Sequence, residues 1–268
     1  MKPIIKWEIS QRKTAIIWWS IGSLAMVALL LLAYPPLKHQ AAQFNAAINQ
    51  LPNGLRQLKS GGGARIDIAD PVDYLNANLY YISLPILFII LSITRGSAVL
   101  GRDEQDRTLE LLLARPVSRG RLLAGKALAV AIETLLVAIV ATLVSVVLAN
   151  AVGLHLASMR LVAIGVYTWL FCLSFGAIAF TLTAVGRFTK RASTAVAVLI
   201  SFGGYLIASL SGLSSALKTV ANFVPYHYFT PDSILRGKAA VGLSLYIMGI
   251  AVVSIIASYL GFRSRDIS

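Results

Sequence analysis

Six stretches of apolar residues, separated by polar segments, dominate the hydropathy pattern of this chain. They cover residues 15–34, 79–100, 127–149, 161–185, 194–213 and 241–262. Crossing a hydrocarbon core of about 30 Å takes about 20 helical residues at 1.5 Å each, and every stretch reaches that length. The pattern therefore predicts an all-α integral membrane protein, with six transmembrane helices in a single domain covering residues 1–268.

Between these stretches, two segments have a pattern of their own. Residues 35–78 form a predicted outside loop, with a hinge at Gly61 to Gly63 and too few residues for an independent domain. Residues 3–11 mix apolar and charged side chains, including Trp7, which predicts a helix lying at the membrane interface.

The composition supports the bilayer as the main surroundings of the chain. Charged residues make up 13% of the sequence and hydrophobic residues 57%, whereas a soluble domain has about 25% charged residues. Cys172 is the single cysteine, which excludes an internal disulfide, a cysteine-based zinc site and a Cys-x-x-Cys redox pair.

The positive charge indicates the orientation of the chain. Its net value of +13 suggests nucleic acid at first, but the basic residues gather beside the apolar stretches, as they do in cytoplasmic loops of membrane proteins. The more basic side carries Lys2, Lys6, Arg12, Lys13, the six cations from Arg102 to Lys126, Arg187, Lys190, Arg191, Arg263 and Arg265. We therefore expect both termini in the cytoplasm and no nucleic-acid partner.

The cytoplasmic loop 101–126 is the most charge-dense part of the chain. Apolar side chains recur there at helical spacing, at Leu109, Leu112 and Leu113. Pro116 should end this short helix at about residue 114, and Ser118 can cap the helix that follows. Such a helix under the membrane can receive a push from another protein and transmit it to two spans. The alternative is a solvated loop with snorkelling arginines.

The loop also carries a recognisable motif. It reads Arg107-Thr108-Leu109-Glu110-Leu111-Leu112-Leu113-Ala114-Arg115-Pro116-Val117-Ser118-Arg119, followed by Leu122-Leu123-Ala124-Gly125-Lys126. This run resembles the signature loop of type-2 ABC exporter permeases, which typically has Gly-Thr-Leu-Glu-Leu-Leu-Leu, a Pro-Val-Ser-Arg turn and then Gly-Lys at the start of the third span. Arg107 stands where that family usually has glycine. Residues 222–231 are similar to the proline-aromatic re-entrant segment of the same permeases.

The resemblance implies a permease subunit whose coupling helix docks on a separate ATPase. The coupling residues would be Arg107, Thr108, Leu109, Glu110, Leu112, Leu113, Arg115 and Pro116. The partners would be two ATPase copies holding ATP and magnesium, a second permease copy and membrane lipid, in the plasma (inner) membrane of a prokaryote. An amphipathic or hydrophobic substrate, such as a lipid, peptide or drug, would move outward. The chain has no Gly-x-x-x-x-Gly-Lys-[Ser/Thr] phosphate loop of its own, so we expect no cofactor in it.

Two opposite charges fall inside predicted spans. Arg95 lies six residues before Gly101, and Glu133 lies seven residues after Lys126, which places each roughly 9–10 Å inside its helix. An unpaired charge in hydrocarbon costs roughly 2.5–3.5 kcal/mol, so we expect the two to pair or to face a water-filled cavity. A static ion pair, a snorkelling Arg95 and a link between the coupling loop and the transport path remain open.

A membrane-embedded enzyme and a membrane scaffold are the alternatives to transport. A membrane-embedded enzyme would need a nucleophile with its base, or a set of metal ligands, at one depth. His39, His155 and His227 all fall in outside loops and supply neither. A membrane scaffold that assists maturation of a surface protein, together with an ABC ATPase, would use the 35–78 loop to bind its partner.

Overall fold

The computed structural model describes residues 2–60, 66–105, 118–186 and 188–263. Within these ranges all regular structure is helical. Six helices are long and apolar enough to cross a membrane, which confirms the predicted fold class. These spans are Lys13–His39, Pro71–Asp103, Arg119–Ala151, Ser158–Ala184, Lys190–Leu213 and Val241–Arg263.

The spans are assembled from the following elements. The first half of the chain holds α1 (Lys2–Gln11), α2 (Lys13–Leu32), α3 (Tyr34–His39), α4 (Ala41–Gln50), α5 (Asn53–Ser60), α6 (Pro71–Leu75), the π-helix η1 (Asn76–Ser83) and α7 (Leu84–Gln105). The second half holds α9 (Arg119–Ala151), α10 (Ser158–Ala184), α11 (Lys190–Ser209), the 3₁₀ turn η2 (Ser211–Leu213), α12 (Ser215–Ala221), α13 (Pro225–Tyr228), α14 (Pro231–Leu235) and α15 (Val241–Arg263).

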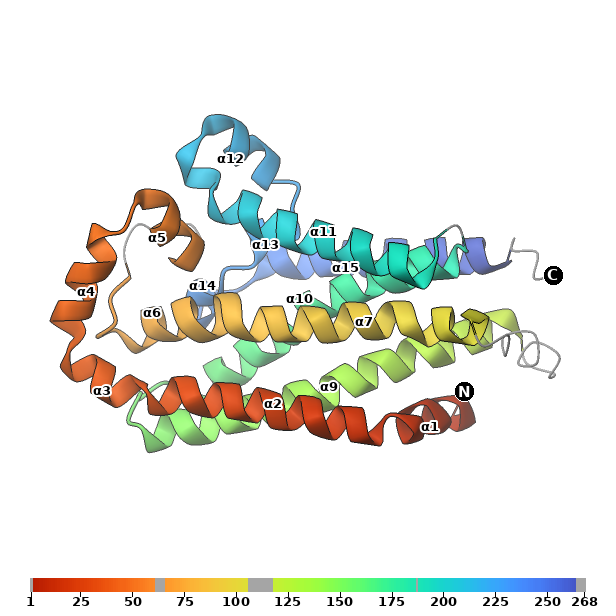
Figure 1. Ribbon diagram of the computed structural model, residues 1–268, viewed down its shortest axis with the longest axis horizontal. Coiled ribbons are helices and arrows are strands. Elements are labelled where there is room, and N and C mark those ends of the chain that lie inside the picture. Colours follow the sequence, from red (N-terminus) through yellow and green to blue (C-terminus); the bar gives the residue numbers. More distant parts are fainter. Residues whose placement is uncertain (1, 61–65, 106–117, 187, 264–268) are drawn as a thin grey trace.

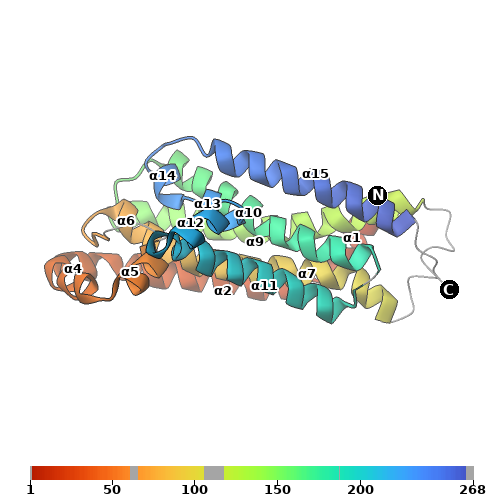
Figure 2. The same cartoon turned by 90° about the horizontal axis from the view of Figure 1, so that it is seen from above.

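The long helices run side by side along the molecule (Figure 1). The chain start at α1 and the end of α15 lie at one end of the bundle, which we call the basic end, and α3–α6 and α12–α14 lie at the other, the capped end (Figures 1 and 2). His39 on α3, His155 in the α9–α10 connection and His227 on α13 are all at the capped end. They come from separate elements, but His39 and His227 lie on short helices rather than in the predicted loops.

The interior of the bundle is built mainly on α7 and α10. The most apolar window of the Pro71–Asp103 span is 61% buried, and that of Val241–Arg263 is 11% buried. The peripheral helix α15 exposes large apolar side chains, among them Val253 and Ile255, to the surroundings. That exposure is stable in a bilayer, where the surrounding solvent is itself apolar.

Two glycines allow the central helices to approach closely. A Cβ at Gly96 on α7 would lie 2.9 Å from the carbonyl carbon of Gly176 on α10, and a Cβ at Gly176 would lie 2.7 Å from the carbonyl oxygen of Ser92. Neither position has room for a side chain. Small residues at such crossings let the two backbones touch. In lipid the hydrophobic effect does not drive helices together, so their association depends on close van der Waals packing of this kind.

The prediction of an outside loop over residues 35–78 is wrong in its structure. Most of this segment is helical in α3–α6, and η1 begins at Asn76. Pro35 does not prevent helix formation here, because it falls in the first turn of α3. Proline is tolerated there because the amide it lacks would have no partner in the helix. The predicted hinge at Gly61 to Gly63 lies outside the described residues.

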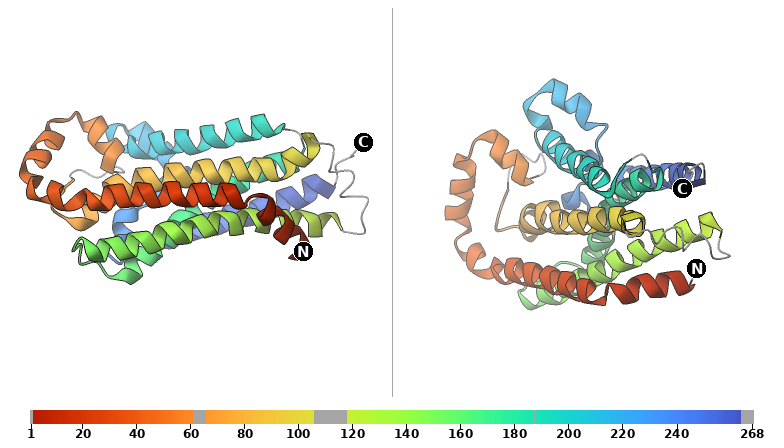
Figure 3. Two further views of the ribbon diagram at one scale, coloured as in Figure 1. Left: turned by 60° about the horizontal axis from the view of Figure 1, so that its bottom comes forward. Right: turned by 45° about the vertical axis from the view of Figure 1, so that its right-hand side comes forward.

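Hydrogen bonds attach this helical segment to the spans. Tyr34 Oη donates to the carbonyl of Ala69 over 3.1 Å, and Asn45 Nδ2 donates to Asp67 Oδ1 over 2.7 Å. Tyr205 Oη on α11 donates to the carbonyl of Leu58 over 2.9 Å. The capped end is therefore a folded layer over the bundle, visible as the curl of α3, α4 and α5 in Figure 3.

An arginine holds α6 and α14 together at the capped end. Arg236 Nη2 lies 2.8 Å from Asp70 Oδ2 and 2.7 Å from Asp73 Oδ1, and Nε lies 2.8 Å from Asp232 Oδ1. The hydrogen bond to Asp70 is the main cause that raises the pKa of Arg236, so this guanidinium stays charged throughout the working range of pH. The side chain is 41% exposed, and solvent limits how much these pairs stabilise the fold.

The proline-aromatic segment 222–231 turns back into the bundle. Tyr226 and Phe229 are 4% and 1% exposed. The ring of Phe229 stacks parallel to Phe171 of α10 with centroids 4.2 Å apart, and Tyr226 meets Phe171 edge-on at 4.8 Å. Burial raises the pKa of the Tyr226 hydroxyl. The segment thus fills the core beneath the capped end with aromatic rings.

Candidate functional site

The coupling loop was the main functional prediction, and its central part falls outside the described residues. This applies to all eight predicted coupling residues, which lie between Arg107 and Pro116. The flanks of the loop are described, and both are helical: α7 continues to Gln105 and α9 starts at Arg119. Ser118 Oγ accepts the Arg121 amide over 3.4 Å, which confirms the predicted helix cap.

A buried lysine joins three helices just inside the flanks of this loop. Lys126 Nζ on α9 donates to Glu8 Oε1 on α1 over 2.7 Å and to the Val99 carbonyl on α7 over 3.0 Å, and it forms an ion pair with Asp103 on α7. The lysine side chain is 1% exposed. A buried ammonium is stable only when charges and dipoles surround it, and this site supplies both.

The role of α1 follows from this contact. Residues 3–11 do form a helix, as predicted, and Trp7 is 54% exposed, which suits a position at the membrane interface. Glu8 on α1 contacts Lys126, and Ile4 packs on Gly125, where a Cβ would lie 3.2 Å from Ile4 Cγ2. α1 is therefore fixed to the start of α9.

The two charges inside the spans pair with one another. Arg95 Nε donates to Glu133 Oε2 over 2.6 Å, and Nη2 lies 2.5 Å from the same oxygen. Their side chains are 12% and 3% exposed, so the pair is largely removed from the surroundings. α7 and α9 are thus linked at two depths, by Lys126 near the loop and by this pair further into the bundle.

A further cation lies close to these charges. Burial lowers the pKa of Arg12, which joins α1 to α2, and the neighbouring Arg95 and Arg102 lower it further, while Glu133 and Glu8 act in the opposite direction. Arg12, Arg95 and Arg102 at the basic end therefore repel one another, and the two buried glutamates Glu8 and Glu133 offset part of this repulsion.

Neutral hydrogen bonds connect α7 and α9 to other spans. Ser97 Oγ on α7 and Thr194 Oγ1 on α11 lie 2.8 Å apart. Trp169 Nε1 on α10 donates to Thr134 Oγ1, next to Glu133, over 3.0 Å. α7 is therefore bonded to α11, and α9 to α10, by neutral hydrogen bonds in addition to the ion pairs between α7 and α9.

The buried charged side chains of this region form ion pairs with one another. In the part of the chain that the structure describes, no three His, Cys, Asp or Glu side chains gather where they could hold a metal ion. The Lys126 ammonium is paired with Glu8 and Asp103, and the three histidines lie at the capped end.

The sequence reasoning identified Arg95 and Glu133 but missed the Lys126 site. From the sequence, Lys126 is one of the cytoplasmic-side cations at the end of the loop, and Glu8 belongs to a predicted interfacial helix. A signal was present, because Gly125-Lys126 belongs to the motif that enters the third span and Glu8 is the one acid in the basic N-terminal segment. The pairing joins residues 118 apart in sequence, and no local pattern reveals it.

Six apolar helices around buried ion pairs define a multi-pass membrane protein. The family model described as ABC-2 family transporter protein matches residues 3–267. Because the match covers nearly the whole chain, the protein belongs to the ABC-2 transporter family, which confirms the resemblance found in the loop. Proteins of this family form the membrane component of transporters. No curated protein sequence matches the chain.

Proposed function

We propose that this protein is the permease subunit of an ATP-driven exporter. Two copies would combine with two copies of a cytoplasmic ABC ATPase, which would hold ATP and magnesium, and the basic end would face the cytoplasm of a prokaryotic cell. The positive-inside distribution of Lys and Arg supports this orientation. An amphipathic or hydrophobic substrate would move outward along a path between the spans.

The observation that carries the proposal is the Lys126 site at the base of the coupling loop. The loop 106–117 joins α7 to α9, and Lys126 ties both helices to α1 directly behind it. A push on the loop by an ATPase would therefore not be absorbed by bending of α7 and α9. It would displace the three helices as a unit.

The Arg95–Glu133 pair extends this unit into the bundle. Separating Arg95 from Glu133 in the low-dielectric interior would cost free energy. We therefore expect α7 and α9 to keep their register during the transport cycle. The moving parts would be the interfaces held by weaker contacts, such as the Ser97–Thr194 bond between α7 and α11. The pair thus acts as a rigid link and not as a binding site for cargo.

Co-purification tests the proposal. The tagged chain is isolated from detergent with its candidate ATPase, and wild type is compared with a Leu109→Asp, Glu110→Arg variant of the loop. Leu55→Asp, at an exposed leucine on α5 of the capped end, is the matched control. We expect the ATPase with wild type and with the control, and its loss with the loop variant while the chain still elutes as a folded monodisperse protein. Failure of any ATPase to associate with wild type would remove the energy source and refute the proposal.

A second candidate is a membrane scaffold that works with an ABC ATPase to assist maturation of a surface protein. The folded helical layer at the capped end favours it, because α4 and α5 present an ordered outer surface with exposed Phe44 and Leu55. The scaffold requires an outside partner, and capture of such a partner by wild type but not by Leu55→Asp would distinguish it. A membrane-embedded enzyme would require chemistry by the purified chain without any ATPase.

A further inference from the structure

A groove runs along the membrane face of the bundle between α9, α10 and α15. It has a volume of about 550 Å³ and is lined almost entirely by apolar side chains. Small residues on all three helices contribute to its walls, including Ala127, Ala131, Gly176, Ala177, Ala251 and Ser254. At these positions the side chains are too small to fill the space between the helices. Its size lies within the range of about 300–1,000 Å³ typical of small-molecule sites.

The groove opens toward the surroundings of the bundle. Leu128 on α9 and Ile255 on α15 border it and are 44% and 69% exposed. In a bilayer such side chains face lipid tails. From Gly120 to Ala131 the wall on α9 rises over about 16 Å, roughly half of the hydrocarbon thickness. The groove therefore reaches from the basic end into one leaflet.

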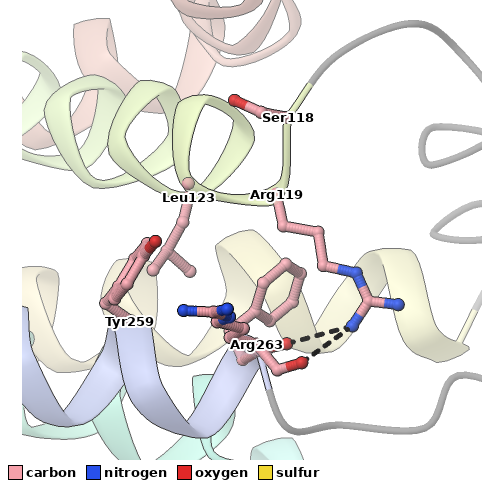
Figure 4. Close-up of a pocket in the computed structure, with 7 residues that line it drawn as sticks. Ser118, Arg119, Leu123, Tyr259 and Arg263 are labelled. Carbon is pink, nitrogen blue, oxygen red and sulfur yellow. Dashed lines mark hydrogen bonds between the residues drawn. The ribbon is translucent and has the colours of Figure 1, made fainter.

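A second pocket of about 260 Å³, whose lining includes Ser118, Arg119 and Arg263, lies next to the groove at the basic end. The two cavities adjoin, since they share Gly120, Leu123 and Tyr259 in their walls, and together we call them the depression. Figure 4 shows Arg119 at the start of α9 beside the last turns of α15, which carry Tyr259 and Arg263, with Leu123 reaching from α9 toward Tyr259, while the hydroxyl of the cap residue Ser118 points away from them. Apolar walls thus give way to hydroxyl and guanidinium groups where the spans end.

Two arginines line this mouth. Arg119 Nη1 donates to the carbonyls of Phe262 and Arg263 over 3.4 and 3.3 Å, which satisfies the end of α15 and holds the guanidinium beside the pocket. Both arginine side chains are exposed. The described residues that line the mouth include no Asp or Glu. The first turn of α9 adds the partial positive charge of a helix N-terminus.

We propose that this depression binds a membrane phospholipid with an anionic headgroup. The phosphate lies between Arg119 and Arg263 with Tyr259 as a hydrogen-bond donor, and an acyl chain lies along the groove past Ala127 and Ala131. A zwitterionic lipid such as phosphatidylcholine carries the same phosphate, but its choline cation would lie close to the two guanidinium groups and be repelled by them. In the orientation proposed above the lipid belongs to the cytoplasmic leaflet and lies directly beside the coupling loop, because Ser118 and Arg119 start the helix that follows that loop.

Binding is tested on the purified permease chain alone, so the result does not depend on any ATPase. The chain is exchanged into detergent with equal amounts of phosphatidylglycerol and phosphatidylcholine, and retained lipids are counted by native mass spectrometry. We expect phosphatidylglycerol to be retained preferentially. An Arg119→Gln, Arg263→Gln variant should lose about fivefold in phosphatidylglycerol affinity for each arginine removed, and should keep its weaker retention of phosphatidylcholine.

Two further variants locate the site. Ala127→Phe fills the groove at an exposed position and should reduce retention of both lipids, whereas Val147→Phe, on the exposed face of α9 farther from the basic end, should change neither. Arg102→Gln, Arg191→Gln removes two exposed cations of the basic end that lie outside the pocket. If this control loses the same preference, the effect is a general charge effect and the assigned site is wrong. It is also wrong if Ala127→Phe alters the oligomeric state and leaves lipid retention unchanged, because a second copy would then occupy the groove.

Discussion

Lys126 Nζ lies 2.7 Å from Glu8 Oε1, and this contact fixes the N-terminal helix to the third span across 118 residues of sequence. The ammonium also faces Asp103 on the second span. One buried cation therefore holds three helices at the point where the coupling loop leaves the bundle. The Glu8–Lys126 and Arg95–Glu133 ion pairs can each be tested by substitution.

Glu8→Gln should lower the stability of the purified chain and detach α1. Breaking a buried ion pair by removing one partner costs about 3–5 kcal/mol, and the loss here should be near the lower limit because Asp103 still faces the lysine. Thermal unfolding in detergent measures the change, and protease sensitivity before residue 13 reports the release of α1. Lys6→Gln, exposed on the same helix, is the control and should leave both readouts unchanged. Equal melting temperatures for Glu8→Gln and Lys6→Gln would show that the contact does not hold α1.

Glu133→Gln should weaken the link between α7 and α9. Arg95 would then remain as a charge without a carboxylate inside the span, at a cost of roughly 2.5–3.5 kcal/mol on insertion scales. We expect lower thermal stability and lower stimulation of the partner ATPase by substrate. The exchange Arg95→Glu, Glu133→Arg should recover part of the stability, since it restores the pair with opposite polarity. Unchanged ATPase stimulation and transport in Glu133→Gln would argue against a coupling role and leave a static ion pair.

Gly96→Ala should destabilise the central helix pair. Its Cβ would meet the Gly176 backbone at 2.9 Å or less, so α7 and α10 must separate. Overpacking of this kind costs about 1–3 kcal/mol. Gly203→Ala on α11 meets nothing within 4 Å and should be neutral or stabilising by roughly 0.5–1 kcal/mol. Equal effects of the two substitutions on urea or thermal unfolding would contradict the close crossing.

Phe229→Ala should loosen the proline-aromatic segment beneath the capped end. The ring is 1% exposed and stacks on Phe171, and truncating a buried phenylalanine costs about 3–5 kcal/mol. Phe223→Ala provides a control in the same segment, because Phe223 is 79% exposed. Hydrogen exchange of residues 222–235 should accelerate in the first variant and not in the second. The same exchange rates in both would mean that the stacking contributes nothing.

The hydropathy of the sequence determined the number, order and approximate bounds of the spans. This was possible because bilayer thickness sets a minimum length of apolar helix, and each span satisfies it locally. The predicted cores at 79–100 and 127–149 lie inside the longer observed spans Pro71–Asp103 and Arg119–Ala151. The helices continue past the apolar residues because backbone hydrogen bonding does not stop where hydropathy does. The sequence also made the pairing of Arg95 with Glu133 an expectation, because helical rise places the two at similar distances from the loop that joins their spans.

The tertiary structure decided which residues meet. Lys126 and Glu8 each appear in the sequence as a surface charge beside an apolar stretch, and their burial depends on how α1 folds back on α9. The sequence predicts a loop over residues 35–78 because this segment has too few apolar positions to span a membrane, and the helices that it forms are held by bonds to distant partners such as Tyr205. The groove between α9, α10 and α15 likewise needs three helices in place, since small residues create a space only where their neighbours fail to fill it. Local hydropathy is a property of consecutive residues, whereas ion pairs and cavities are properties of helices that meet from distant parts of the chain.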